Sequence, residues 1–169
     1  MYKRQIVVFV GGVSPNLEGE EMGVELPGFR GGDRTDIELP AVQRELMVVM
    51  SHVATPSGVV NPNPLSAAEL TLRCEQEMDA MTVLLTDNGY FLLPGGTPIS
   101  AQLQFARTVA RRAERRLWTL HRQDPVNEDI LRFINRLSDL FFVMARMEMQ
   151  RQDWPEEKWQ EFAYKRKRQ

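Results

Sequence analysis

The clearest helical pattern in this chain lies in Glu128-Asp-Ile-Leu-Arg-Phe-Ile-Asn-Arg-Leu-Ser-Asp-Leu-Phe-Phe-Val-Met-Ala-Arg146. Its apolar residues recur at steps of three and four, which predicts a helix with one buried face. That core face comprises Ile130, Leu131, Ile134, Leu137, Phe141 and Met144. Asn135 and Asp139 interrupt the apolar pattern. Because a buried polar group costs free energy unless it finds a partner, both indicate either a structural hydrogen bond or a binding site.

The preceding helix is predicted to concentrate positive charge. Five arginines lie within Arg107-Thr-Val-Ala-Arg-Arg-Ala-Glu-Arg-Arg116. Arg107, Arg111 and Arg115 are four residues apart and therefore form one stripe. Glu114 lies close to this stripe and can pair with one of the arginines. A row of guanidinium groups matches the oxygen atoms of a polyphosphate. The alternative is a solvated face with internal salt bridges, which the apolar neighbours of Arg107 and Arg111 disfavour.

The chain divides into two parts of different character. Residues 1–38 form an atypical segment that is rich in glycine and lacks periodicity, whereas residues 39–169 predict a helical bundle. Helices are expected at residues 38–54, 66–85, 98–121 and 125–150, followed by a short one opened by Trp154-Pro155. No strand is needed in this part. The expected fold is therefore all-α, an up-down bundle of four to five helices.

Three helix starts have recognisable capping residues. Ser66 and Glu69 have the spacing of a capping box, in which both side chains bind backbone amides of the first turn. Thr97-Pro98 supplies an N-cap followed by a proline at the first helical position. Asp124-Pro125 is expected to do the same for the last long helix.

Composition limits the possible functions. The net charge of −2 over 169 residues disfavours nucleic-acid binding by bulk charge. The single cysteine, Cys74, excludes an internal disulfide, fits a reducing compartment and is expected to be a small core residue. No apolar run is long enough to span a membrane, so the cytoplasm is the expected compartment. His52 and His121 are far apart, and no protein-bound metal site is expected.

A short apolar loop, Phe91-Leu-Leu-Pro-Gly-Gly96, precedes the arginine-bearing helix. One interpretation is a hydrophobic lid over the end of the bundle. The other is a wall against a flat, apolar ligand, with Phe91 as its aromatic surface.

Three separated blocks of sequence resemble the signature blocks of the PduO-type ATP:cob(I)alamin adenosyltransferases. They are the apolar loop at residues 91–96, the arginine run at 107–116 and the polar-interrupted helix at 135–146. The agreement extends back to Gln43-Arg-Glu-Leu46 and forward to Trp159. It covers about three quarters of the chain, with the blocks in the family's order.

The resemblance implies a bundle of the cobalamin adenosyltransferase type that forms a homotrimer with active sites between subunits. It implies transfer of the 5′-deoxyadenosyl group from ATP to cob(I)alamin, which gives adenosylcobalamin and triphosphate, with Mg²⁺ assisting. Cobalt(I) in a corrin is already a strong nucleophile. The protein therefore has to orient ATP and stabilise the leaving triphosphate rather than supply a base.

The resemblance also assigns roles in ATP binding. Arg107, Arg111 and Arg115 would bind the nucleotide, and Arg107 and Arg111 would take part in catalysis by stabilising the leaving group. Asn135 would contact ATP as well.

The remaining site residues have other implied roles. Phe91 would press on the lower face of the corrin and displace its axial ligand, which makes cobalt(II) easier to reduce. Glu114 and Asp139 would hold the arginines and the helices in place.

The sequence departs from the family at its beginning. Family members begin with a glycine-rich loop resembling Thr-Lys-Thr-Gly-Asp-x-Gly, which wraps the triphosphate, and a helix with an Asp-Glu-Leu motif follows. Neither is found in residues 1–38. Arg30-Gly-Gly-Asp-Arg-Thr35 is weakly similar to the loop but lies directly before the helix at Leu39. A second interpretation is therefore a catalytically impaired homologue that assembles and binds corrinoid or nucleotide without turnover.

Overall fold

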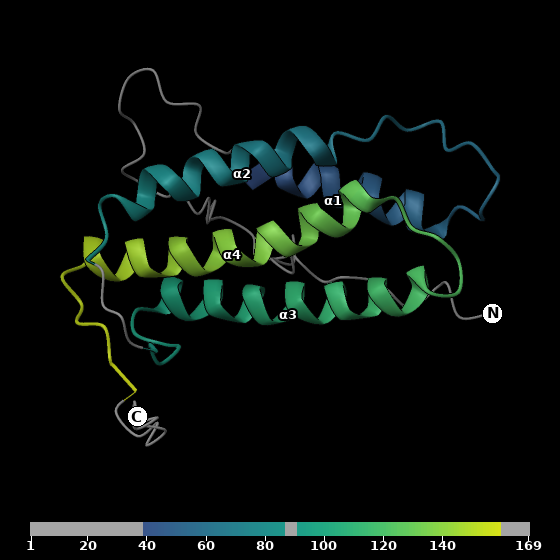
Figure 1. Cartoon of the computed structure of the whole chain (residues 1–169). Helices are drawn as coiled ribbons and strands as arrows, with labels where there is room; N and C mark the ends of the chain where they lie inside the picture. Colours follow the sequence, from purple (N-terminus) through teal and green to yellow (C-terminus); the bar gives the residue numbers. More distant parts are fainter. Residues whose placement is uncertain (1–38, 87–90, 160–169) are drawn as a thin grey trace, which may run out of the picture.

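The computed structural model describes residues 39–86 and 91–159. These contain four helices: α1 (Leu39–Ala54), α2 (Ala67–Thr82), α3 (Pro98–His121) and α4 (Glu128–Arg151). Successive helices run in opposite directions along the bundle (Figure 1). The predicted all-α, up-down bundle is thus confirmed. The atypical segment at residues 1–38 lies outside the described residues.

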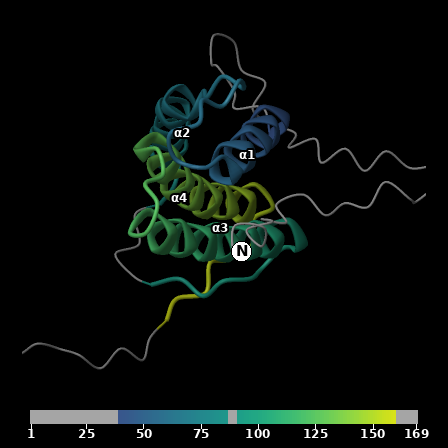
Figure 2. The ribbon, with the colours of Figure 1, turned by 90° about the vertical axis from the view of Figure 1, so that its right-hand side faces the viewer.

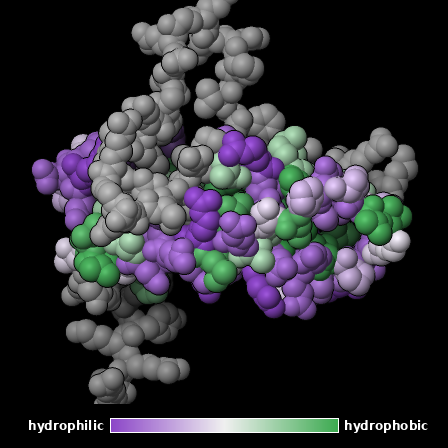
Figure 3. All heavy atoms as spheres, turned by 90° about the horizontal axis from the view of Figure 1, so that it is seen from above, coloured by the Kyte–Doolittle hydropathy of each residue, from purple (hydrophilic) through white to green (hydrophobic). Residues whose placement is uncertain are grey.

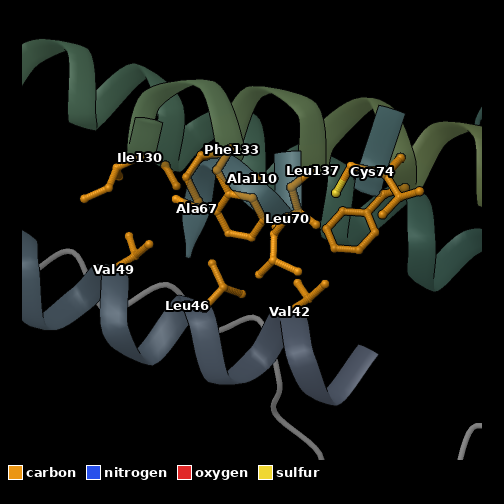
Figure 4. Close-up of a cluster of buried hydrophobic side chains, with 14 of the residues drawn as sticks. Val42, Leu46, Val49, Ala67, Leu70, Cys74, Ala110, Ile130, Phe133 and Leu137 are labelled. Carbon is orange, nitrogen blue, oxygen red and sulfur yellow. The ribbon is translucent and has the colours of Figure 1, made fainter. Parts of the chain in front are cut away.

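Helix α4 lies in the middle of the bundle. Viewed along the helices, α3 lies on one side of α4, and α1 and α2 lie on the other (Figure 2). Side chains from all four helices contribute to one core (Figure 4). Those labelled there are Val42, Leu46 and Val49 of α1, Ala67, Leu70 and Cys74 of α2, Ala110 of α3, and Ile130, Phe133 and Leu137 of α4. The core face predicted for α4 is therefore correct.

The single cysteine is part of this core, as expected. Cys74 is fully buried, and burial raises the pKa of its thiol to about 11. A thiol with such a pKa stays protonated at neutral pH and behaves as a small apolar side chain.

The start of α3 agrees with the sequence prediction. The Thr97 hydroxyl accepts a hydrogen bond from the Ser100 backbone N–H at 3.1 Å, and Pro98 occupies the first helical position. The predicted end at His121 is also the observed end. These signals are local in sequence, so no distant residue is needed to place the helix.

The capping box predicted for α2 is wrong. The Ser66 side chain makes no capping hydrogen bond, since its backbone is not in the extended conformation that an N-cap requires. The Ser66 N–H donates instead to the carboxylate of Glu45 on α1, at 2.9 Å. A buried acid from another helix thus replaces Glu69. The helix also ends at Thr82, before the predicted residue 85.

Two other predicted helix boundaries need correction. Helix α4 begins after Asn127, whose side chain accepts from the Asp129 N–H at 2.8 Å, and not after Asp124-Pro125. The Asp124 carboxylate accepts a hydrogen bond from the Ser57 hydroxyl in the α1–α2 connection. The short helix predicted after Trp154 is absent from residues 154–159, where Lys158 instead forms an isolated antiparallel bridge with Leu92.

On the α1 and α2 side of the bundle, the hydrophobic residues among the described ones lie in separate groups between hydrophilic residues (Figure 3). None of the helices in the described part of the chain is both long and apolar enough to cross a membrane.

Candidate functional site

Some of the predicted polar residues of α3 and α4 meet along the seam between these two antiparallel helices. The Glu114 carboxylate of α3 accepts a hydrogen bond from the Asn135 side-chain amide of α4 at 3.0 Å. Two turns away, the Arg107 guanidinium lies over the Phe142 ring, 5.2 Å from its centroid. Such a contact orients the cation by its attraction to the face of the ring. Three of the predicted site residues are thus held in place by contacts between α3 and α4.

A groove of about 480 Å³ surrounds the Glu114–Asn135 contact. It is lined by Glu114, Trp118, His121, Glu128, Leu131, Arg132 and Asn135. Trp118 is 46% exposed and packs against the edge of His121, with the ring centroids 5.5 Å apart. The sequence analysis missed Trp118. Its signal was a large aromatic residue one helical turn after Glu114, on the polar side of α3.

The other arginines of α3 face away from the bundle. Arg111, Arg112, Arg115 and Arg116 are exposed. Within residues 39–86 and 91–159, no salt bridge involves any of these four side chains. The internal salt bridges of the alternative interpretation therefore do not form in the described part of the chain. Four outward guanidinium groups make this side of α3 attractive to a polyanion.

Asp139 makes a different connection. Its carboxylate accepts a hydrogen bond from the Arg136 guanidinium at 3.1 Å, and Arg136 also donates to Glu75 of α2 at 2.8 Å. Asp139 thus belongs to a network that joins α4 to α2. Among the described residues it forms no ion pair with an arginine of α3.

Phe91 lies at the other end of the α3–α4 pair, in the loop before α3. It is 72% exposed. Its backbone carbonyl accepts a hydrogen bond from the Trp159 N–H at 2.8 Å, and the Leu93 N–H donates to the Glu157 carbonyl at 2.9 Å. Phe91 is therefore presented to solvent by a short antiparallel pairing with the segment that follows α4.

One chain does not bring Phe91 to the groove. Glu114 lies about 24 Å along α3 from its first residue, Pro98, at about 1.5 Å per residue. Phe91 precedes that first residue. The described part of a single chain thus carries two separate elements, an aromatic surface at one end and a polar groove toward the other.

The profile of a known protein family, described as cobalamin adenosyltransferase, matches residues 25–148. This chain belongs to the cobalamin adenosyltransferase family. The match covers every predicted site residue from Phe91 to Asp139. The resemblance to PduO-type enzymes is therefore confirmed.

Comparison with individual members of the family supports the same assignment. The chain is 36% identical over 124 residues to a corrinoid adenosyltransferase of Bacillus subtilis, covering 73% of this chain and 63% of the relative. It is 40% identical over 118 residues to one from Mycobacterium tuberculosis, covering 67% and 60%. The chain thus spans about 60% of the length of these curated relatives.

A solved structure of a family member has the same helical arrangement. It is a Phe-to-Ala variant of a PduO-type ATP:corrinoid adenosyltransferase from Lactobacillus reuteri, complexed with cobalamin and ATP. It superposes with a TM-score of 0.69 at 33% identity, over 72% of this chain and 68% of that chain. The helical bundle of this chain is therefore the fold found in a solved member of the family.

Proposed function

We propose that this chain transfers the 5′-deoxyadenosyl group of ATP to cob(I)alamin, which gives adenosylcobalamin and triphosphate. The observation that supports this most directly is the groove at the Glu114–Asn135 contact, beside exposed arginines of α3 that have no salt-bridge partner in the described part of the chain. Family membership and a relative that binds both cobalamin and ATP give the ligands.

The chemistry requires little more than orientation and charge stabilisation. Cobalt(I) attacks the C5′ carbon of ATP, the cobalt–carbon bond forms, and the C5′–O bond breaks with its electron pair leaving on triphosphate. Arg111 and Arg115 are suited to stabilise that negative charge, because they are exposed guanidinium groups on one stripe of α3. Arg107, held over Phe142, supplies a third positive charge in a fixed position.

Asn135 and Glu114 set the position of the nucleotide. The Asn135 amide is oriented by its hydrogen bond to the Glu114 carboxylate, so its carbonyl oxygen is directed away from that bond and is available to ATP. Asp139 supports the site indirectly through the network between α4 and α2.

Magnesium would be bound with the triphosphate. No group of three or more acidic, histidine or cysteine side chains within residues 39–86 and 91–159 is arranged to hold a metal ion. Mg²⁺ commonly keeps several waters and is held through substrate phosphates with one or two carboxylates. Glu114 is a carboxylate in the groove that fits this mode.

The active site is proposed to form between subunits of a homotrimer. Phe91 and the groove are separated along α3 in one chain, so a second copy has to bring its Phe91 to the groove of the first. The outer side of α3 also carries the exposed hydrophobic residue Phe105, whose burial would favour assembly. In such a site Phe91 presses on the lower face of the corrin and displaces the axial ligand.

The deciding experiment is a spectroscopic assay with ATP, Mg²⁺ and chemically reduced cob(I)alamin under anaerobic conditions. Decay of the cobalt(I) absorbance with formation of adenosylcobalamin at an enzymatic rate supports the proposal. The same preparation should be examined for assembly by light scattering and for ATP binding by calorimetry. An assembled protein with no product and no ATP affinity would contradict the proposal and favour the catalytically impaired homologue.

A further inference from the structure

The segment that follows α4 turns back and meets the loop that carries Phe91. This segment, residues 154–159, is called the tail; it is not helical, and its Lys158 pairs with Leu92 in an antiparallel bridge. Figure 2 shows the tail, in yellow, reaching the teal loop below α3. Residues 154–159 lie beyond the part of the chain that the family profile matches. Their role therefore has to be derived from their contacts.

This tail is anchored by a two-point ion pair. The Arg146 guanidinium of α4 donates to both carboxylate oxygens of Glu156, at 2.6 and 3.1 Å. It also donates to the Thr86 carbonyl at 2.8 Å. The two side chains are only 16% and 18% exposed, whereas those of the Arg136–Glu75 pair are 43% and 42% exposed. A shielded, bidentate pair is more rigid than a solvated one and depends more strongly on both partners.

A second contact connects the same loop to α4. Gly96 has a φ of +87° and lies against the Met149 side chain and Trp154, so a side chain at this position would be strained and crowded. The Trp154 N–H donates to the Met149 carbonyl at 2.9 Å, which attaches the first residue of the tail to the end of α4. The loop is therefore fixed near Gly96 by packing and near Phe91 by the tail.

We infer that the Arg146–Glu156 ion pair is a positioning device for Phe91. The pair fixes the tail, and two backbone hydrogen bonds from the tail fix the loop at Phe91 and Leu93. Phe91 is 72% exposed, so the hydrogen bonds that hold its backbone contribute to the orientation of its ring. The inference rests on the proposed function, in which this ring must press on the corrin.

The first test replaces Glu156 and compares two substrates. Glu156→Gln keeps the shape of the side chain but removes its charge. The variant should slow adenosylation of cob(II)alamin, supplied with a chemical reductant, by about tenfold, while the reaction of pre-reduced cob(I)alamin changes by about twofold or less. The fraction of cob(II)alamin without an axial ligand, measured by electron paramagnetic resonance, should fall in parallel. Glu157→Gln is the matched control, because it removes a charge from the same segment at an exposed side chain that forms no ion pair among the described residues.

The second test removes one backbone hydrogen bond. Trp159→Pro deletes the N–H that donates to the Phe91 carbonyl, whereas Trp159→Ala removes the side chain and keeps this donor. The proline variant should lower the cob(II)alamin rate further than the alanine variant does. Because residue 159 lies after the last described helix, the bundle should remain folded in both. Circular dichroism checks this directly.

The outcomes separate the inference from the proposed function. If Phe91→Ala lowers the cob(II)alamin rate selectively while Glu156→Gln and Trp159→Pro behave like wild type, the tail does not position the ring and the inference is wrong. If Phe91→Ala slows both substrates equally, the assigned role of Phe91 fails and the inference fails with it. A wild-type protein that makes no adenosylcobalamin would overturn the proposed function first.

Discussion

Helices α3 and α4 have the same length, 24 residues, but differ in how much of their surface is buried. Twelve residues of α4 are buried, compared with five of α3. Helix α4 is covered by α3 on one side and by α1 and α2 on the other, whereas α3 contacts the bundle along one side (Figure 2). The sequence reflects this, because α4 carries most of the large apolar residues and α3 carries the arginine run.

The contrast predicts that α4 mainly determines the stability of the bundle and that α3 mainly determines its activity. Substitutions at the centre of α4 should lower the free energy of unfolding, because they remove contacts with all other helices. Substitutions of the arginines on α3 should lower the rate of reaction and leave unfolding almost unchanged. The Glu114–Asn135 hydrogen bond joins the two helices and should influence both properties.

The largest effect is expected from Phe133→Ala in α4. Phe133 is fully buried between the helices, and truncation of such a residue costs about 3–5 kcal/mol. Chemical denaturation followed by circular dichroism measures this loss. Leu72→Ala is the control, because Leu72 is 60% exposed on α2 and should change stability by about 0.5 kcal/mol or less. Similar losses in the two variants would contradict the central role of α4.

The largest effect on activity is expected from Arg111→Ala. Removing one group that stabilises charge in a transition state costs about 10²–10³ in kcat, or about 2.7–4 kcal/mol. The free energy of unfolding should change by no more than about 0.5 kcal/mol. Initial rates with cob(I)alamin and saturating ATP measure the first quantity. Arg122→Ala, an exposed arginine at the end of α3, is the control. Wild-type kinetics for Arg111→Ala would mean that this side of α3 is an ordinary solvated surface.

An intermediate effect is expected for the contact between the helices. Glu114→Ala and Asn135→Ala should be coupled by about 1 kcal/mol in a double-mutant cycle of unfolding, because the hydrogen bond is partly shielded and involves a charge. The same cycle measured on the dissociation constant of ATP should also be non-additive. Asn135→Ala combined with Glu75→Ala should be additive, since these side chains make no mutual contact. Additivity for Glu114 and Asn135 would show that the observed hydrogen bond contributes little.

Several features of α3 and α4 could be predicted because they depend only on residues that are close together in the sequence. Thr97-Pro98 placed the start of α3 because a cap and its amide are three residues apart. The periodicity of α4 identified the buried face that contains Ile130 and Leu137. The stripe on α3 and the polar residues on α4 follow from the same helical geometry, and so the seam of the candidate site was predictable.

Apart from the local cap at Asn127, the features that were missed depend on residues far apart in the chain. Ser66 is bound by Glu45 of another helix, and local capping rules do not contain this partner. The pairing of residues 157–159 with the Phe91 loop forms only after α4 has brought the two segments together. Trp118 was not recognised because the groove that it lines exists only when α3 and α4 are packed.

The smallest effect concerns the buried carboxyl group of Glu45, which lies outside both long helices. Burial raises its pKa above the ordinary value of 4.5, and the hydrogen bond from the Ser66 N–H partly opposes this shift. A carboxyl group whose pKa is higher in the folded state binds its proton more tightly there. Its contribution therefore favours folding at low pH and is lost as the pH rises through the raised pKa. Glu45→Gln keeps an oxygen that accepts from Ser66 and carries no charge.

The stability of Glu45→Gln relative to wild type should accordingly increase from about pH 4 to about pH 7. Urea denaturation at several pH values measures this difference, and Glu69→Gln, an exposed acid in the first turn of α2, is the control. A relative stability that decreases with rising pH would mean that the Ser66 hydrogen bond outweighs burial and that the Glu45 carboxylate is the stabilising form. In that case the junction of α1 and α2 would depend on a charge, unlike α4, which is held by apolar packing.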